Sequence, residues 1–130
     1  WGGLGWLWNK PVAFIFFFFL RYTYEFIESG GRITLSFLPE AFKPVLNLCG
    51  SKSGRDIDKI KETGLLPLET ERGGVAFEQN RITLDCRPLF RSPMQECQFQ
   101  DSDVLSRWYN DRPGGSLHVM YVLEIEDVYQ

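Results

Sequence analysis

Basic side chains, hydroxyls and a glycine come together in one polar stretch, residues 51–55, which is Ser-Lys-Ser-Gly-Arg. Between Lys43 and Lys61 the chain has five Lys or Arg against two Asp, a local charge of 5 − 2 = +3 in a chain of net charge −3. Cations beside a helix start suit anions such as phosphate. The stretch therefore predicts either a site for a phosphate-bearing cofactor or a solvated connection between two helices. It is not a Walker A loop, because Arg-Asp follows Gly54.

Two further positions have side chains that are able to do chemistry. Arg21 stands beside Thr23, which is a possible helix N-cap, so the pair predicts a second anion site or an ordinary cap with a surface arginine. His118 is the sole histidine, which leaves no Ser-His-Asp or Cys-His arrangement to propose. We expect His118 to be either a satisfied structural residue or a hydrogen-bond donor and proton source near a ligand.

Composition limits the class of protein. A chain of 130 residues that is 44% hydrophobic is expected to form one domain over residues 1–130, with a core of its own. The net charge of −3 argues against nucleic-acid and anionic-membrane partners. Three dispersed cysteines without a CxxC motif predict reduced thiols in the cytoplasm and no structural zinc or other metal site. The apolar run from Pro11 to Leu20 is too short for a membrane-spanning helix, which needs about 20 residues.

Helical spacing flanks the polar stretch on both sides. Apolar side chains at i, i+3, i+4 and i+7 predict a helix with one buried face, which begins at Pro39-Glu40, is kinked by Pro44 and ends at Gly50. That face is made of Phe42, Val45, Leu46 and Cys49. After the stretch, a second helix is expected over residues 56–63, with Gly64 as its stop signal.

The rest of the chain is mostly β in pattern. Residues 1–9 are expected to form a tight loop packed by indoles, or a turn that lies against something flat. Strands are predicted at 12–20, 32–38, 65–70, 75–77, 81–89 and 117–129, and short helices at 23–29 and 103–109. In the strand at 81–89, Cys86 is expected to face the core. About six strands with short helices predict a mainly β fold, an antiparallel barrel with helical insertions.

Four stretches of the chain resemble a known family. They are WGGLGWLWNKPVAFIF, RYTYEF, LNLCGSKSGRDIDKIKETGL and the final H-x-M-Y-x-x-E-I-E. Together they resemble the flavin reductase-like, FMN-binding split-barrel family, and its flavoredoxin-type branch in particular. The resemblance implies a split β-barrel of antiparallel strands, a homodimer, and an oxidoreductase that moves electrons from NAD(P)H through FMN to a second acceptor. Because the chain opens on Trp1 without an initiator methionine, we expect it to lack the N-terminal strand of its relatives.

The resemblance also assigns residues to the cofactor. It implies that Arg21, Tyr22 and Thr23 hold the FMN phosphate. It places Ser51, Lys52, Ser53 and Lys59 beside the flavin, and Trp1 and Gly2 along the isoalloxazine ring. It sets His118 near the flavin or nicotinamide as the catalytic side chain.

A competing hypothesis is a dimeric split-barrel module that serves a structural or ligand-sensing role without tight flavin binding. Two features motivate it: the absent N-terminal stretch, and the run Phe17–Leu20 where the family usually has an Arg-Pro pair. The colour of the purified protein separates the two hypotheses, because a bound flavin makes it yellow.

Overall fold

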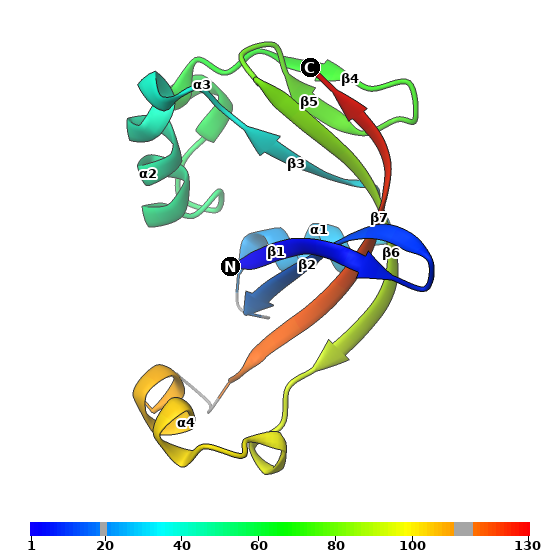
Figure 1. Cartoon of the computed structure of the whole chain (residues 1–130). Helices are drawn as coiled ribbons and strands as arrows, with labels where there is room; N and C mark the ends of the chain where they lie inside the picture. The colour runs from blue at the N-terminus through cyan, green and yellow to red at the C-terminus, as the bar shows by residue number, and fades with distance from the viewer. Residues whose placement is uncertain (19–20, 111–115) are drawn as a thin grey trace.

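The computed structural model describes residues 1–18, 21–110 and 116–130. The chain folds mainly as antiparallel sheet with short helices, as the sequence predicts (Figure 1). One sheet has five strands in the order β1-β2-β7-β6-β3, and β4 pairs with β5 in a second, small sheet. The strands are β1 (Gly2–Leu7), β2 (Lys10–Phe18), β3 (Ile33–Phe37), β4 (Pro67–Glu69), β5 (Val75–Phe77), β6 (Ile82–Pro93) and β7 (His118–Tyr129).

The core lies on one face of the central strands. In the β2–β7 pair, Ala13 stands opposite Leu123 and Ile15 opposite Tyr121, and all four are buried. Alternation along the strands places these side chains on one face, where they form a single cluster with residues of β6 and α1. Cys86 is fully buried in this cluster, which confirms its predicted place in the core.

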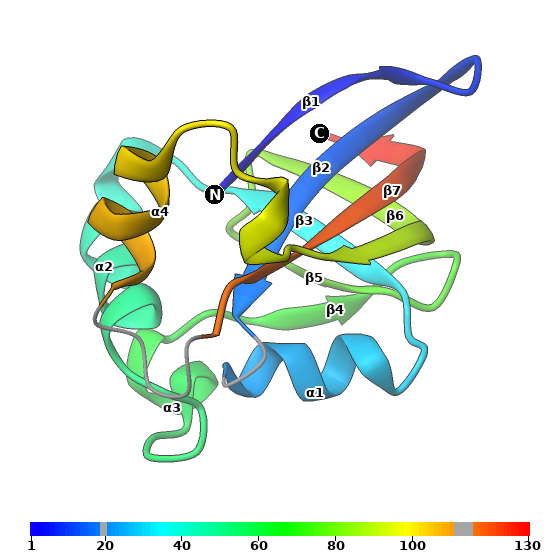
Figure 2. The same cartoon turned by 90° about the horizontal axis from the view of Figure 1, so that it is seen from below.

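The helices are short and lie around the sheet. They are α1 (Tyr22–Glu28), α2 (Lys43–Ser51), α3 (Lys59–Thr63) and α4 (Ser102–Tyr109), with 3-10 turns η1 (Glu40–Phe42) and η2 (Glu96–Gln98). Figure 1 shows α2 and α3 at one end of the molecule and α4 at the other, with the N-terminus of the chain between them. Figure 2 shows that these three helices lie to the same side of the sheet.

Most of the predicted elements are confirmed. The strands expected at 32–38, 75–77 and 117–129 and the helix at 103–109 are present within one or two residues of their predicted bounds. Gly64 ends α3 in the left-handed region, at φ 72°, as its stop signal predicts. The last two residues of the strand predicted at 12–20 lie outside the described residues.

The expectation of a loop at the N-terminus is wrong. Residues 2–7 form the edge strand β1, which pairs with β2 through a tight turn at Trp8 and Asn9. Both turn residues have positive φ, 51° and 59°, which matches the twist of a hairpin. The glycines suggested a loop, yet Gly2 is needed in the strand: a Cβ there would lie 2.1 Å from the carbonyl oxygen of Phe14.

Three expectations about helix α2 are corrected. The chain makes the 3-10 turn η1 first, so Pro44 falls in the first turn of α2, where its missing N–H breaks no bond and no kink is needed. The helix continues through Gly50 to Ser51. Its apolar face is not buried, since Leu46 is 48% exposed.

The expected starts of α1 and α3 are also corrected. Arg21 occupies the N-cap position of α1 without a side-chain cap, and Thr23 lies inside the first turn. Helix α3 begins at Lys59, because the Asp58 side chain caps it by accepting a bond from the Lys61 N–H at 3.2 Å.

Candidate functional site

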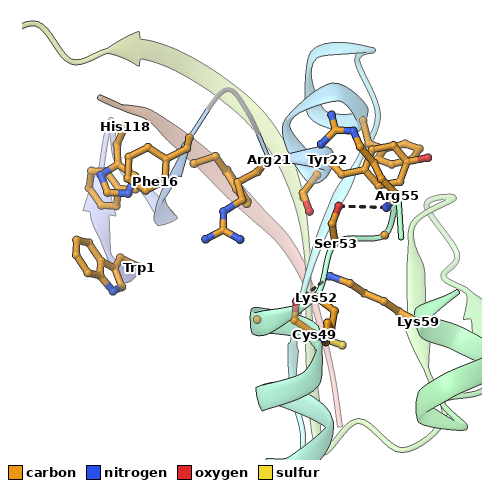
Figure 3. A pocket seen from close by; sticks show the side chains of 16 residues that line it. Trp1, Phe16, Arg21, Tyr22, Cys49, Lys52, Ser53, Arg55, Lys59 and His118 are labelled. Atoms are coloured by element: carbon orange, nitrogen blue, oxygen red, sulfur yellow. Dashed lines mark hydrogen bonds between the residues drawn. The ribbon is translucent and has the colours of Figure 1, made fainter. Parts of the chain in front are cut away.

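A cavity of about 890 Å³ lies where the ends of β1 and β2, helix α1, the start of β7 and the α2–α3 loop meet (Figure 3). This volume is within the range of small-molecule sites, about 300–1,000 Å³. Its wall contains eight of the ten residues that the resemblance assigns to the site. They are Trp1, Arg21, Tyr22, Thr23, Lys52, Ser53, Lys59 and His118. Segments far apart in the sequence therefore meet at one cavity.

The other two assigned residues, Gly2 and Ser51, do not line the cavity. Gly2 lies in β1 with its backbone close to Phe14. Ser51 is the last residue of α2, and its hydroxyl donates to the Leu48 carbonyl at 3.3 Å. Each is next in sequence to a lining residue, Trp1 and Lys52 respectively.

One side of the cavity is aromatic. The rings of Phe18 and His118 stack at a centroid distance of 3.8 Å, and the Trp1 indole lies 5.4 Å from the His118 ring. Phe16 completes this side, and Figure 3 shows Trp1, Phe16 and His118 grouped together. Such a surface suits a flat aromatic ligand.

His118 has features of both predicted roles. It is 6% exposed, and its Nδ1 lies 2.6 Å from the hydroxyl of Tyr109, as expected of a satisfied structural residue. It also lines the cavity, as expected of a residue that faces a ligand. Tyr109 comes from the end of α4 and was missed by the sequence analysis, because nothing in its local pattern indicates a partner in another element.

The opposite side of the cavity is basic, and two of its cations are engaged by other groups. The Lys59 ammonium donates to the Cys49 carbonyl at the end of α2, at 2.7 Å. The Arg55 guanidinium forms an ion pair with Glu25 and lies 4.9 Å from the centre of the Tyr22 ring.

The other two cations are uncommitted. Within the described ranges, the side chains of Arg21 and Lys52 have no hydrogen bond or ion pair. Figure 3 shows the Arg21 guanidinium pointing into the open space between the aromatic side and Lys52. The cavity therefore combines an aromatic surface with two cations that are available to an anion.

Helix α1, which carries Tyr22 and Thr23, is fixed to the sheet by a polar cluster. The Tyr121 hydroxyl donates to the Glu28 carboxylate, and Arg91 bonds both Glu28, at 2.8 Å, and the Tyr24 hydroxyl, at 2.6 Å. The hydrogen bond from Tyr121, followed by the interaction with Arg91, holds the pKa of Glu28 below its ordinary value. Ile27 is buried beside this cluster, so α1 is a firm support for the cavity.

Several lining residues were not assigned from the sequence, among them Phe16, Phe18 and Gly54. Phe16 and Phe18 had a usable signal, since residues two apart in a strand face the same side.

The described part of the chain holds no group of three or more His, Cys, Asp or Glu side chains that is able to bind a metal ion. In the same residues, no helix is long and apolar enough to cross a membrane.

Comparison with known proteins identifies the family of this chain. The family model for the flavin reductase like domain matches residues 10–130. The chain belongs to the flavin reductase-like family. A comparison with curated protein sequences finds no match.

Solved structures show the same fold. The FMN-binding protein from Thermus thermophilus with bound p-hydroxybenzaldehyde has a TM-score of 0.72 and 18% identity, over 100% of this chain and 60% of that one. Flavoredoxin of Desulfovibrio vulgaris (Miyazaki F) has a TM-score of 0.73 and 18% identity, over 99% and 57%. Flavoredoxin from Methanosarcina acetivorans has a TM-score of 0.69 and 20% identity, over 98% and 59%. The chain is thus a split β-barrel, and it spans less than two thirds of the length of these structures.

Proposed function

We propose that this flavin reductase-like domain, residues 1–130, binds FMN in the 890 Å³ cavity and acts as an NAD(P)H-dependent oxidoreductase. The observation that carries the proposal is the pairing of an aromatic surface with two uncommitted cations, Arg21 and Lys52, in one cavity. FMN has the complementary form, a flat ring system joined to a phosphate. The name of the Thermus protein, which is FMN-binding, supports the same ligand.

The roles of the residues follow from their places in the wall. Arg21 supplies a charged fork for the phosphate, and the hydroxyls of Tyr22 and Thr23 supply further donors. Trp1 packs along the ring, with Gly2 holding its strand in place. Lys52, Ser53 and Lys59 flank the ring from the basic side, and Ser51 ends the helix that precedes Lys52 and Ser53.

When bound, FMN supplies the redox chemistry, taking a hydride from NAD(P)H and passing electrons to a second acceptor. The ammonium groups of Lys52 and Lys59 favour negative charge on that side of the cavity. His118, oriented by Tyr109, holds a proton in the cavity wall as its catalytic contribution. No catalytic triad is required, which is consistent with a chain that has one histidine.

The test is to purify the protein and titrate it with FMN and then with NADH or NADPH. A yellow protein that binds one FMN per chain and is bleached by a nicotinamide supports the proposal. A colourless protein that stays colourless after addition of FMN overturns it and favours the structural or ligand-sensing module.

We further propose that two copies associate as a homodimer. Edge strand β1 and its turn carry Leu4, Trp6 and Trp8, which are 60%, 65% and 52% exposed. An apolar strand at an open sheet edge is a ready surface for a partner.

The three free cysteines, Cys49, Cys86 and Cys97, agree with the cytoplasm as the proposed location.

A further inference from the structure

The loop between α2 and α3, residues 52–58, is attached to α1 by a contact that the sequence does not predict. Arg55 forms an ion pair with Glu25, and its guanidinium carbon lies 4.9 Å from the centre of the Tyr22 ring. Figure 3 shows Arg55 and Tyr22 side by side. We call Glu25, Tyr22 and Arg55 the clasp.

Gly54 allows the clasp to close. A Cβ at this position would lie 2.8 Å from Cδ1 and 3.1 Å from Cε1 of Tyr22. The tyrosine ring therefore lies directly against the loop backbone, and any side chain at position 54 would push it away.

Further hydrogen bonds between described residues shape the loop from within. The N–H of Arg55 donates to the Ser53 hydroxyl at 3.1 Å, and the N–H groups of Asp56 and Ile57 donate to the Ser53 carbonyl at 3.0 and 3.2 Å. Lys59, the first residue of α3, donates to the Cys49 carbonyl and so ties the start of α3 to α2. Because the loop is bonded within itself, the clasp also sets where Lys52 and Ser53 stand in the cavity wall.

The clasp also lies between the cavity and a second, open pocket. This outer pocket has a volume of about 650 Å³. Five residues line both this pocket and the cavity: Tyr22, Phe26, Gly54, Arg55 and Lys59. These shared residues therefore form the boundary between the cavity and the outer pocket.

We propose that the clasp positions the loop carrying Lys52 and Ser53 and limits the rate at which the cofactor leaves the cavity. The inference rests on the proposed function for the identity of that cofactor. Glu25, Gly54 and Arg55 are positioning residues in this scheme, since they act through Tyr22 and the loop. Arg55 then serves the loop and not the phosphate, which is left to Arg21.

The expected effect is modest, because the side chains of Arg55 and Glu25 are 42% and 56% exposed. Exposed ion pairs contribute little each, so Glu25→Gln is expected to raise the FMN dissociation rate about twofold to fivefold. The association rate should change less, and added salt should raise the dissociation rate of the wild type toward that of the variant.

The matched control is Asp127→Asn. Asp127 also pairs with an exposed arginine, Arg72, but neither residue lines the cavity or the outer pocket. This substitution is expected to leave FMN dissociation unchanged. Gly54→Ala is a second probe, which opens the clasp by displacing Tyr22 without removing a charge.

Hydrogen exchange of the amides of residues 52–58, measured on the flavin-free protein, separates the clasp from the function. Faster exchange in Glu25→Gln and Gly54→Ala, with Asp127→Asn unchanged, is the expected result. Unchanged exchange in both clasp variants would overturn the inference, as would an unchanged FMN dissociation rate. A wild type that does not bind FMN would overturn the proposed function and with it the role in cofactor release, while the exchange result would still decide whether the clasp positions the loop.

Discussion

At the scale of single residues, Arg21 carries the strongest prediction. Its guanidinium faces the cavity and, in the described part of the chain, has no partner. We expect Arg21→Ala to weaken FMN binding by about 2–3 kcal/mol, the scale of hydrogen bonds to charged groups. Riboflavin lacks the phosphate, so its affinity should be nearly unchanged. Titration of both flavins against both proteins measures the difference.

Arg81→Ala is a suitable control for this experiment, since Arg81 is exposed and does not line the cavity. It is expected to leave both affinities unchanged. Equal losses for FMN and riboflavin in Arg21→Ala would show that Arg21 supports the fold or the ring. The phosphate site would then have to be sought at Lys52.

The cysteines differ in their expected reactivity. Cys86 is fully buried, and desolvation raises the pKa of its thiol to about 12. At pH 8 the reactive thiolate is therefore essentially absent at Cys86, whereas Cys97 is exposed to the solvent. Alkylation of the native protein followed by mass spectrometry should modify Cys97 first and Cys86 only after unfolding. Modification of both at equal rates would place Cys86 outside a stable core.

At the scale of elements, the attachment of α1 to β7 makes folding stability depend on pH. The bond from Tyr121 helps keep the pKa of Glu28 below its ordinary value of 4.5 in the folded state. A lowered folded pKa gives stability that is present above pH 4.5 and is lost as pH falls through the folded value. Tyr121→Phe should therefore be less stable than the wild type at pH 7. The difference in the free energy of unfolding between the two proteins should be smaller at pH 3. Urea unfolding at both pH values measures it.

Tyr129→Phe is the matched control for this element. Tyr129 lies on the same strand, and its buried hydroxyl has no partner among the described residues. The difference in the free energy of unfolding between Tyr129→Phe and the wild type is expected to be the same at pH 7 and at pH 3. If the difference for Tyr121→Phe is also the same at both pH values, Tyr121 acts by packing alone.

At the scale of the whole molecule, the exposed edge predicts self-association. A stable dimer buries about 800 Å² per partner, and the apolar side chains of β1 are an available surface for it. Sedimentation velocity at micromolar concentration is expected to show a dimer. Trp6→Lys should shift the protein toward monomer, while Val75→Lys, which is similarly exposed on the small sheet, should not. A wild-type monomer at these concentrations would contradict the proposed dimer.

The sequence by itself determined the elements whose signals are local. Alternation marked β3 and β7, Gly64 as a stop signal marked the end of α3, and helical spacing marked α4. The resemblance then identified half of the residues of the cavity wall, because the matching motifs lie in the segments that meet there. Such signals depend on residues a few positions apart, which sequence patterns record directly.

Only the tertiary structure decided which groups became partners over long distances. Residues 2–7 became a strand because β2 offered an edge, and the apolar face of α2 stayed only partly covered, with Leu46 exposed. Asp85 is the clearest case. It alternates with the core residues Leu84 and Cys86, and such alternation would by itself place its side chain on the solvent side of the strand.

Asp85 is instead fully buried. Its carboxylate accepts bonds from Arg32, at 2.8 Å, and from the Thr70 hydroxyl. A buried charge is tolerated only where such partners surround it. Those partners come from segments 53 and 15 residues away, and their meeting depends on how the sheet closes. Periodicity within one strand cannot record that closure, since it describes which way a side chain points and not what the rest of the chain places there.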